Sequence, residues 1–443
     1  MRVRNLLGLV LCVGLAGCGG SDTAAPQSQE VPTTGGDWPM YGHDTGRTSY
    51  NPDETAINLA NVDRLTERFH VAVGIGEIPS SSGPVVANGR VYVGSSLAAG
   101  DNYFCFDAST GARVWSANVG HSPPFLGNVG IGSTAAVVDG RVVLGGGDPA
   151  YYGLDAATGA ILWRHDMAQT AEAFAWSSPL VANGLAYVGM SSRYKAVRGE
   201  LRALDVRDGS VQARQYFVPE GRQGADIWNS PSLSPDGSSV VVASGNDFGG
   251  YDGPLTRAMI AMDPADLAIQ ASHKVAAFNQ DLDFGTTPVF FHDAQGRNLV
   301  GANEKDGRFF AYELRSLGQG PVWQRATGLS VGAMPAYDPR TAPGGTLFIV
   351  GDNGVLFGVD PATGVDRWPP VAVGFATANL AAANGLVFMG AGGGSVAVIE
   401  AETGAILRVL DPTISGRTFS GSVLSHGILY WMSGAYLNAW AVP

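Results

Sequence analysis

Five side chains in the middle of the sequence are of types that could act together on a bound molecule. Trp228 in DIWNSP has a large flat ring, and Asn246 in ASGND has an amide oxygen, a hard donor suited to a hard cation. Two carboxylates follow at Asp281 and Asp283 in NQDLDFGTT, and an ammonium follows at Lys305 in EKDGRFF. A stacking ring, a proton acceptor and a cation suit chemistry on a planar organic molecule, provided that the fold brings them together.

Each of these residues also has a simpler structural explanation. A tryptophan often packs in a core, and an asparagine between Gly245 and Asp247 often makes a turn. Lys305 and its neighbours could be solvated charges of a hairpin loop. The elements that would position these side chains therefore decide between the two interpretations.

A repeated pattern predicts those elements. The segments CFDASTGARVW, GLDAATGAILW and GVDPATGVDRW share an Asp that can cap a turn, a Gly that can adopt a positive φ, and a Trp that can pack on a neighbouring unit. Degenerate copies give eight positions equivalent to the Asp, at residues 107, 155, 205, 263, 313, 360, 400 and 438. Alternating apolar strands with Asn-Gly or Asp-Gly hairpin signals precede the turns. Four strands per unit at this spacing predict an all-β, eight-bladed β-propeller.

The ends of the chain predict how the ring closes. The last unit, from about residue 418, has room for only three strands, whereas residues 65–74 form a strand without a unit of their own. We expect the N-terminal strand to complete the last blade and protect its edge. Residues 37–443 are then a single domain.

The opening DWPMYGHDTGRTSYNPDETAINLANVDRL, the Trp-containing repeats and the stretches around 228, 246, 283 and 305 resemble the pyrroloquinoline-quinone (PQQ) dehydrogenases, especially their polyvinyl-alcohol-dehydrogenase-like branch. This resemblance implies PQQ as the cofactor, with Trp228 as the floor on which it stacks and Asn246 as a Ca²⁺ ligand. It implies that Asp283 accepts the alcohol proton and contacts the metal, with Asp281 as the alternative candidate for this role. It implies that Lys305 donates to the quinone oxygens and assists catalysis.

One segment departs from the family pattern. The remaining Ca²⁺ carboxylate of the family, a Glu, is expected where this sequence has Tyr194 or Lys195, and Glu200 lies too late, inside the next strand. An ammonium in place of a carboxylate would repel a divalent cation. Either Lys195 substitutes for the metal as a fixed positive charge at the cofactor, or the site has lost its chemistry, or the alignment of this loop is wrong.

The N-terminus predicts export. Residues 1–17 have two arginines and a short apolar run, which are typical of a signal peptide, and LAGC at 15–18 resembles a bacterial lipoprotein box with Cys18 as the lipidated residue. Residues 18–36 are rich in Pro, Ser, Thr and Gln and are expected to form a flexible tether. Gly19 and Gly20, by analogy with lipoproteins, favour the periplasmic side of the outer membrane.

Composition excludes several alternatives. The formal charge of −12 becomes about −14 once Arg2 and Arg4 are removed, which argues against nucleic-acid binding. The seven histidines lack zinc-site spacing, and no Cys-x-x-Cys-His haem motif is present, so an external electron acceptor would be needed. Two hypotheses remain: a PQQ dehydrogenase that oxidises a small or polymeric alcohol, and a non-catalytic outer-membrane lipoprotein scaffold or degenerate PQQ-binding protein.

Overall fold

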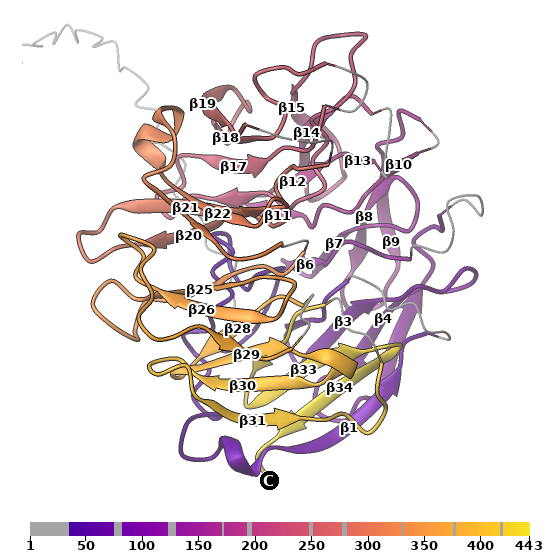
Figure 1. Cartoon of the computed structure of the whole chain (residues 1–443). Coiled ribbons are helices and arrows are strands. Elements are labelled where there is room, and N and C mark those ends of the chain that lie inside the picture. The colour runs from indigo at the N-terminus through magenta and orange to yellow at the C-terminus, as the bar shows by residue number, and fades with distance from the viewer. Residues whose placement is uncertain are drawn as a thin grey trace, which may run out of the picture.

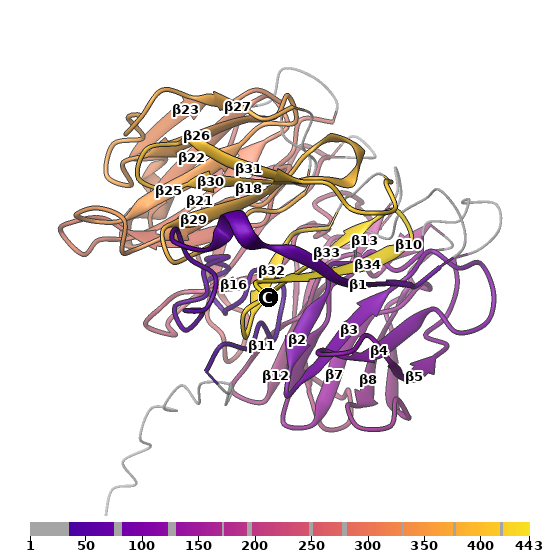
Figure 2. The same cartoon turned by 90° about the horizontal axis from the view of Figure 1, so that it is seen from below.

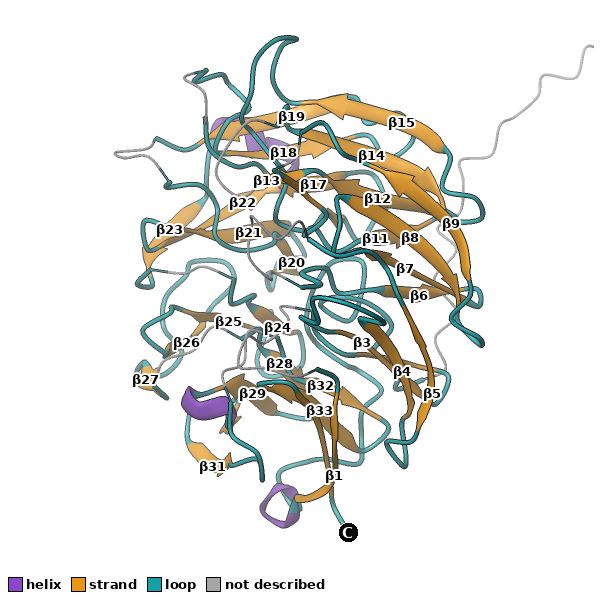
Figure 3. Ribbon diagram, turned by 90° about the vertical axis from the view of Figure 1, so that its right-hand side faces the viewer, coloured by secondary structure: helices purple, strands orange, loops and turns teal. Residues whose placement is uncertain are grey.

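The structure is a computed structural model, and it describes residues 35–74, 82–122, 130–170, 172–192, 197–247, 251–276, 281–329, 332–374, 378–416 and 420–443. Strands dominate the described residues, and Figure 3 shows only short helical segments beside them. These are three 3-10 helices, η1 (Val62–Arg64), η3 (Leu314–Gln319) and η4 (Gly392–Gly394).

Eight four-stranded antiparallel sheets form the blades of a propeller, and their colours follow the sequence around the ring in Figure 1. The first four blades are β2–β5 (Val85–Ala87, Arg90–Gly94, Tyr103–Asp107, Arg113–Ala117), β6–β9 (Ala136–Val138, Arg141–Gly145, Ala150–Asp155, Ile161–Asp166), β11, β12, β14 and β15 (Leu180–Ala182, Leu185–Gly189, Glu200–Asp205, Val211–Tyr216), and β16–β19 (Ser232–Leu233, Val240–Ala243, Ala258–Met262, Ile269–Lys274). A small extra sheet pairs β10 (Ala173–Phe174) with β13 (Ser191–Ser192).

The remaining blades complete the circle. They are β20–β23 (Val289–His292, Asn298–Glu304, Arg308–Glu313, Trp323–Ala326), β24–β27 (Ala336–Asp338, Thr346–Val350, Val355–Val359, Val371–Ala372), β28–β31 (Ala381–Ala383, Leu386–Gly390, Val396–Glu400, Ile406–Leu410), and β32–β34 (Val423–Ser425, Ile428–Ser433, Tyr436–Ala441) joined by β1 (Thr66–Ala72). The predicted eight-bladed, all-β architecture is confirmed.

The N-terminal strand closes the ring as the sequence predicted. β1 pairs with β34 in antiparallel register from Thr66 opposite Ala441 to Ala72 opposite Tyr436. Figure 2 shows these two strands side by side although they lie at opposite ends of the chain. The pairing satisfies the main-chain groups along one edge of β34, which would otherwise be open to another chain.

The repeated turns lock each blade to the next. Asp107 and Asp155 accept main-chain hydrogen bonds from the residues two and three positions later, so they cap the turns as predicted. The repeat tryptophans donate their indole N–H to a carbonyl of the following blade at 2.9–3.1 Å, in the pairs Trp115–Ala156, Trp163–Val206, Trp323–Pro361 and Trp368–Ala401. The last predicted repeat position, Asn438, is different: it lies within β34 rather than at a turn, because no further strand follows it.

An N-terminal collar, residues 36–51, runs around the ring and was not predicted. Its main chain bonds to the innermost strands of the blades in sequence order, with seven hydrogen bonds of 2.8 Å that join Trp38 and Val86 in both directions, Pro39 and Val137, Thr45 and Leu233, Gly46 and Phe290, Thr48 and Tyr337, and Ser49 and Ala382. Asn51 Nδ2 reaches Leu424 O of the last blade at 2.8 Å. The collar therefore joins blades that are far apart in the sequence.

Arg47 supplies the collar's link to the third blade. Its side chain is fully buried, and it donates to Pro179 O at 3.1 Å and to Pro231 O at 2.9 Å, the residues directly before β11 and two before Leu233. It also donates to Tyr41 O within the collar. Burial lowers the pKa of Arg47 to about 10, so the guanidinium stays charged at neutral pH. With this residue the collar contacts all eight blades.

Candidate functional site

The predicted site residues lie at one end of the fourth and fifth blades. Trp228 and Asp283 precede the innermost strands β16 and β20, whereas Asn246 and Lys305 follow the second strands β17 and β21. In an antiparallel sheet, the start of one strand and the end of its neighbour lie at the same edge. The fold therefore brings side chains that are up to 77 residues apart in sequence to one place.

Asp283 is the centre of this group. Its side chain is 2% exposed, and Oδ2 accepts the indole N–H of Trp228 at 2.6 Å. Its Oδ1 lies 2.6 Å from Lys305 Nζ and accepts from Asn246 Nδ2 at 2.9 Å. Three donors thus hold one carboxylate, and since an ionised carboxylate has about four lone-pair sites, one position remains for a further proton or ligand.

Trp228 is not a core tryptophan. Its side chain is only partly buried, and Lys305 Nζ lies 4.9 Å from the ring centroid. Lys305 is not a solvated loop charge either, because its side chain is 16% exposed and ion-paired with both Asp281 and Asp283. Trp228 is therefore not fully buried, and Lys305 is paired rather than free in solvent.

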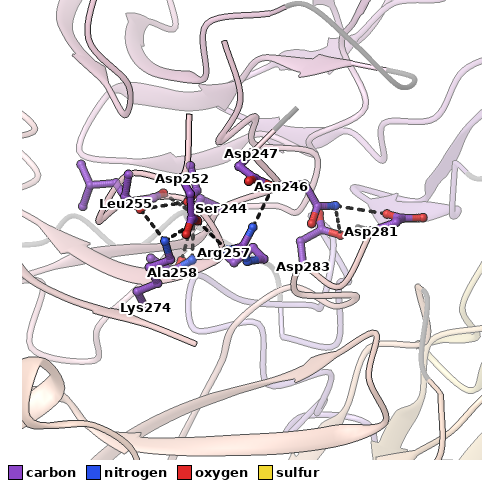
Figure 4. Close-up of polar contacts among 12 residues, drawn as sticks. Ser244, Asn246, Asp247, Asp252, Leu255, Arg257, Ala258, Lys274, Asp281 and Asp283 are labelled. Carbon is purple, nitrogen blue, oxygen red and sulfur yellow. Dashed lines mark hydrogen bonds and ion pairs between the residues drawn. The ribbon is translucent and has the colours of Figure 1, made fainter. Parts of the chain in front are cut away.

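Asn246 links the two carboxylates, as Figure 4 shows. Its Nδ2 donates to Asp281 Oδ1 at 3.2 Å as well as to Asp283, while its buried Oδ1 has no hydrogen-bond partner among the residues that the structure describes. Asp281 itself is 59% exposed, with φ at 69°. A buried oxygen without a partner is a candidate ligand for a cation or a bound molecule, since such an atom is costly to leave unsatisfied.

Burial sets the acid–base character of the pair. It raises the pKa of the Asp283 carboxyl, although Lys305 and the indole of Trp228 partly oppose this. Burial lowers the pKa of the Lys305 ammonium, but the charges of Asp283 and Asp281 outweigh it, so the pKa is raised overall. Asp283 is therefore a buried carboxyl with a raised pKa, next to an ammonium whose pKa is also raised.

A second ion network braces the loop that carries Asn246. Buried Arg257 donates to Asp247 at 2.8 Å and to Asp252 at 2.6 Å, and Lys274 also pairs with Asp252 (Figure 4). Asp247 and Asp252 thus pair with cations of the protein itself. Their role is to hold the two ends of this loop.

Other sequence predictions fall outside the site or outside the described residues. Tyr194 and Lys195 belong to residues 193–196, and Cys18 belongs to residues 1–34, which the structure does not describe. Glu200 begins β14, fully buried and paired with Arg202 at 2.7 Å, so its exclusion from the site agrees with the fold. Cys105 is a buried thiol in β4, and burial raises its pKa to about 12.

Asp226, two residues before Trp228, was not predicted from the sequence. This carboxyl is 3% exposed, and burial together with the charge of Asp283 raises its pKa to about 7. The one available signal was an acidic residue within the otherwise apolar and small-residue segment GADIW.

The net charge of the site favours an added cation, but the described side chains do not form a complete set of metal ligands. Asp281 and Asp283 stand against the single ammonium of Lys305 in the described part of the site. Within the described ranges, no group of three His, Cys, Asp or Glu side chains converges as a metal site. A divalent cation here would be held by Asn246 Oδ1 and Asp283, with other ligands supplied by the bound molecule.

Comparisons with known proteins confirm the family resemblance. A family model, PQQ_2, described as "Outer membrane protein assembly factor BamB", matches residues 58–316 and 318–425. The quinohemoprotein alcohol dehydrogenase of Comamonas testosteroni is 24% identical over 62% of this chain and 45% of its own length. The polyvinylalcohol dehydrogenase of a Pseudomonas species is 21% identical over 73% of this chain and 53% of its own length.

An assembly factor is among the relatives as well. The outer membrane protein assembly factor BamB of Yersinia pestis is 23% identical over 73% of this chain and 77% of its own length. The chain spans between about a quarter and a half of the length of the alcohol dehydrogenases that it matches, with shares of 26%, 45% and 53%.

Solved structures show the same fold. The crystal structure of the Comamonas testosteroni enzyme superposes with a TM-score of 0.75 and 17% identity, covering 92% of this chain and 80% of the other. A europium-containing methanol dehydrogenase superposes with a TM-score of 0.76 and 15% identity, covering 92% and 98%. None of the helices in the described residues is long and apolar enough to cross a membrane. By its family match over most of its length, the chain belongs to the PQQ_2 family of β-propellers.

Proposed function

We propose that this protein binds PQQ and oxidises an alcohol. The observation that carries the proposal is the convergence on Asp283 of an indole, an ammonium and an amide from two blades, at 2.6 to 2.9 Å. A partly exposed indole offers a face for stacking, and a buried carboxylate with one free lone-pair position offers a base. The alcohol dehydrogenases among the relatives support the same function.

Each residue has a distinct task in this proposal. PQQ, when bound, supplies the two-electron acceptor. Trp228 stacks on it, and Asp283 accepts the hydroxyl proton of the alcohol. Lys305 opposes the negative charge of a tricarboxylate and keeps Asp283 ionised at a lower pH than burial alone would allow. Asn246 orients Asp283 through Nδ2 and offers Oδ1 to a cation.

The charge of the site leads us to include Ca²⁺. A tricarboxylate entering beside two aspartates meets net repulsion that Lys305 alone does not cancel, and a divalent cation on Asn246 Oδ1 would offset it. Lys195 is the alternative source of positive charge. The two sources differ in one measurable respect, because only the first makes PQQ affinity depend on Ca²⁺.

The test is a titration of the mature protein with PQQ, with Ca²⁺ and with a chelator, followed by quinone absorbance and by dye reduction with a panel of alcohols. We expect binding that the chelator weakens at least tenfold, and turnover that depends on an external acceptor. Binding that is indifferent to Ca²⁺ would favour Lys195. Absence of PQQ binding under all conditions would remove the proposal.

Trp228→Ala tests the stacking floor. Loss of one aromatic platform is expected to weaken PQQ binding roughly 100-fold, equivalent to about 3 kcal/mol, while the thermal unfolding temperature stays near that of the parent protein because the ring is partly exposed. Trp228→Phe keeps a ring but loses the N–H that donates to Asp283. Its PQQ affinity should lie between those of the parent protein and Trp228→Ala. Unchanged affinity in Trp228→Ala would show that PQQ stacks elsewhere.

The second candidate function is a non-catalytic scaffold anchored through Cys18 at the periplasmic side of the outer membrane. The coverage of 77% of the Yersinia pestis assembly factor favours it, since that relative matches over more of its own length than the three dehydrogenases compared above. A scaffold would bind no quinone, so the same titration separates the two functions. Lipid attachment at Cys18 is tested by labelling with a radioactive fatty acid and by the Cys18→Ala variant.

A further inference from the structure

The segment that leads to Trp228 lies between two loops of neighbouring blades. Ile227 N donates to Met190 O at 2.7 Å, and Ser191 Oγ donates to Ile227 O at 3.1 Å, on the side of the third blade. On the side of the fourth blade, Ala225 N donates to Asn246 O at 2.7 Å, and Gly245 N donates to Asp226 O at 2.8 Å. Residues 225–227 thus act as a short bridge between the ends of β12 and β17.

Asp226 extends this bridge with its side chain. Its Oδ2 accepts from Ser192 N at 3.0 Å and from Ser192 Oγ at 3.2 Å. Its Oδ1 lies against Gly245, where an added Cβ would be only 1.9 Å away, so that only glycine fits beside this carboxylate. One carboxyl group therefore contacts Ser192, at the end of β13, and Gly245, the residue before Asn246.

The backbone around Asp226 is strained in a way that fixes its direction. Ala225 has φ at 53°, a left-handed conformation that is costly for a residue with a Cβ. Such conformations persist where surrounding hydrogen bonds determine them, and here both flanking loops supply those bonds. The Asp226 side chain accepts from Ser192, while Trp228, two residues later, donates to Asp283.

We propose that Asp226 is a positioning residue of the quinone site, whose carboxylate holds Ser192 at the end of β13 and packs against Gly245, and so sets the spacing between Trp228 and Asn246. This role rests on the proposed function, because the spacing matters only if a ligand is held there. Asp226 acts through Asn246 and Trp228 and does not itself accept the substrate proton.

Two variants test the role, with a matched control. Asp226→Ala removes both acceptors, and we expect PQQ affinity to fall at least tenfold. Asp226→Asn keeps an oxygen for the Ser192 main chain, and we expect affinity within about threefold of the parent protein. Asp338→Ala is the control: Asp338 is likewise a buried aspartate with a pKa raised by burial, but it lies in the innermost strand of the sixth blade, and it should leave affinity unchanged.

Gly245→Ala tests the contact between Gly245 and the Asp226 carboxylate by changing the glycine instead of the aspartate. It should weaken PQQ binding in the parent protein, because the new Cβ displaces the Asp226 carboxylate. Added to Asp226→Ala, it should cost less than it costs alone, because the clashing oxygen is gone. Additive losses in this double-mutant cycle would overturn the proposed contact.

A measurement without PQQ separates this inference from the function on which it rests. Amide hydrogen exchange of residues 190–192 and 244–247 should accelerate in Asp226→Ala, recover in Asp226→Asn and stay unchanged in Asp338→Ala. Faster exchange in a protein that binds no quinone would support the bridge and reject the dehydrogenase. Equal PQQ affinity of the parent protein and Asp226→Ala would reject the positioning role and leave the dehydrogenase intact.

Discussion

Lys305 and Asp283 form the charge pair that determines how the site responds to pH. The ammonium opposes the effect of burial on the Asp283 carboxyl, so removing it should raise the pKa of Asp283 further. In Lys305→Met we expect the acidic limb of the kcat/KM profile to move to higher pH, because Asp283 then ionises only at higher pH. Lys305→Arg retains the charge and should keep the limb close to its original position. An unmoved limb in Lys305→Met would mean that another group limits the reaction at low pH.

Asp226 should also affect the pH dependence of folding. Its pKa is about 7 in the folded protein against an ordinary value of 3.8, so the folded state disfavours the ionised form. Below pH 4 the group is protonated in both states and costs nothing, whereas between pH 4 and pH 7 the folded protein progressively loses stability, by roughly 4 kcal/mol in total. Asp226→Asn removes this loss. The unfolding temperature of Asp226→Asn should therefore rise relative to that of the parent protein as pH increases from 4 to 8. If the difference between the two unfolding temperatures does not change with pH, the raised pKa of Asp226 is contradicted.

At the scale of single residues, the sequence could identify side chains only where they stand in recognisable segments. Trp228, Asn246, Asp283 and Lys305 do so, and the fold brings them into contact. Asp226 was missed because its importance comes from Ser192 and Gly245, which approach it through the packing of two blades. Nothing in its local sequence records those contacts.

At the scale of elements, the repeats and the collar show opposite degrees of predictability. The turns recur, so their Asp, Gly and Trp positions are visible in sequence, and the tryptophans do bond to the following blade. The collar has no period, because its residues bond to successive blades at irregular spacing. Its sequence therefore indicated a family motif but did not predict the path of the collar around the ring.

Arg47 provides the test of the collar. Arg47→Met keeps an apolar side chain of similar length but leaves the carbonyls of Tyr41, Pro179 and Pro231 without their buried donor. Since hydrogen bonds to a charged group contribute about 1.5–3 kcal/mol each, the variant should lose several kcal/mol of unfolding free energy. Urea unfolding measures this loss. Arg340→Met is a suitable control, because Arg340 donates to Pro52 from a more exposed position, and a loss equal to that of Arg47→Met would argue against a special role for the collar.

At the scale of the whole molecule, the N-terminal region closes the ring in two ways. β1 completes the blade that contains the C-terminus, and the collar bonds to the innermost strands of the other blades (Figure 2). The site, in contrast, is built from the connections of the fourth and fifth blades. The geometry of the site thus depends on a ring that the first described residues hold together.

A shortened chain tests this dependence. A chain that begins at Ser82 lacks the collar and β1, so it exposes the edge of β34 and the inner strands lose their shared partner. We expect it to unfold at lower temperature with reduced cooperativity and to form aggregates in gel filtration, whereas a chain that begins at Gly35 should behave as the mature protein does. Supplying residues 35–74 as a separate peptide should restore part of the lost stability, because the same strand pairing can form between two chains. A shortened chain that melts cooperatively at the parent temperature would show that the blades close the ring without the N-terminal region, and that the spacing of Trp228, Asn246 and Asp283 is fixed locally.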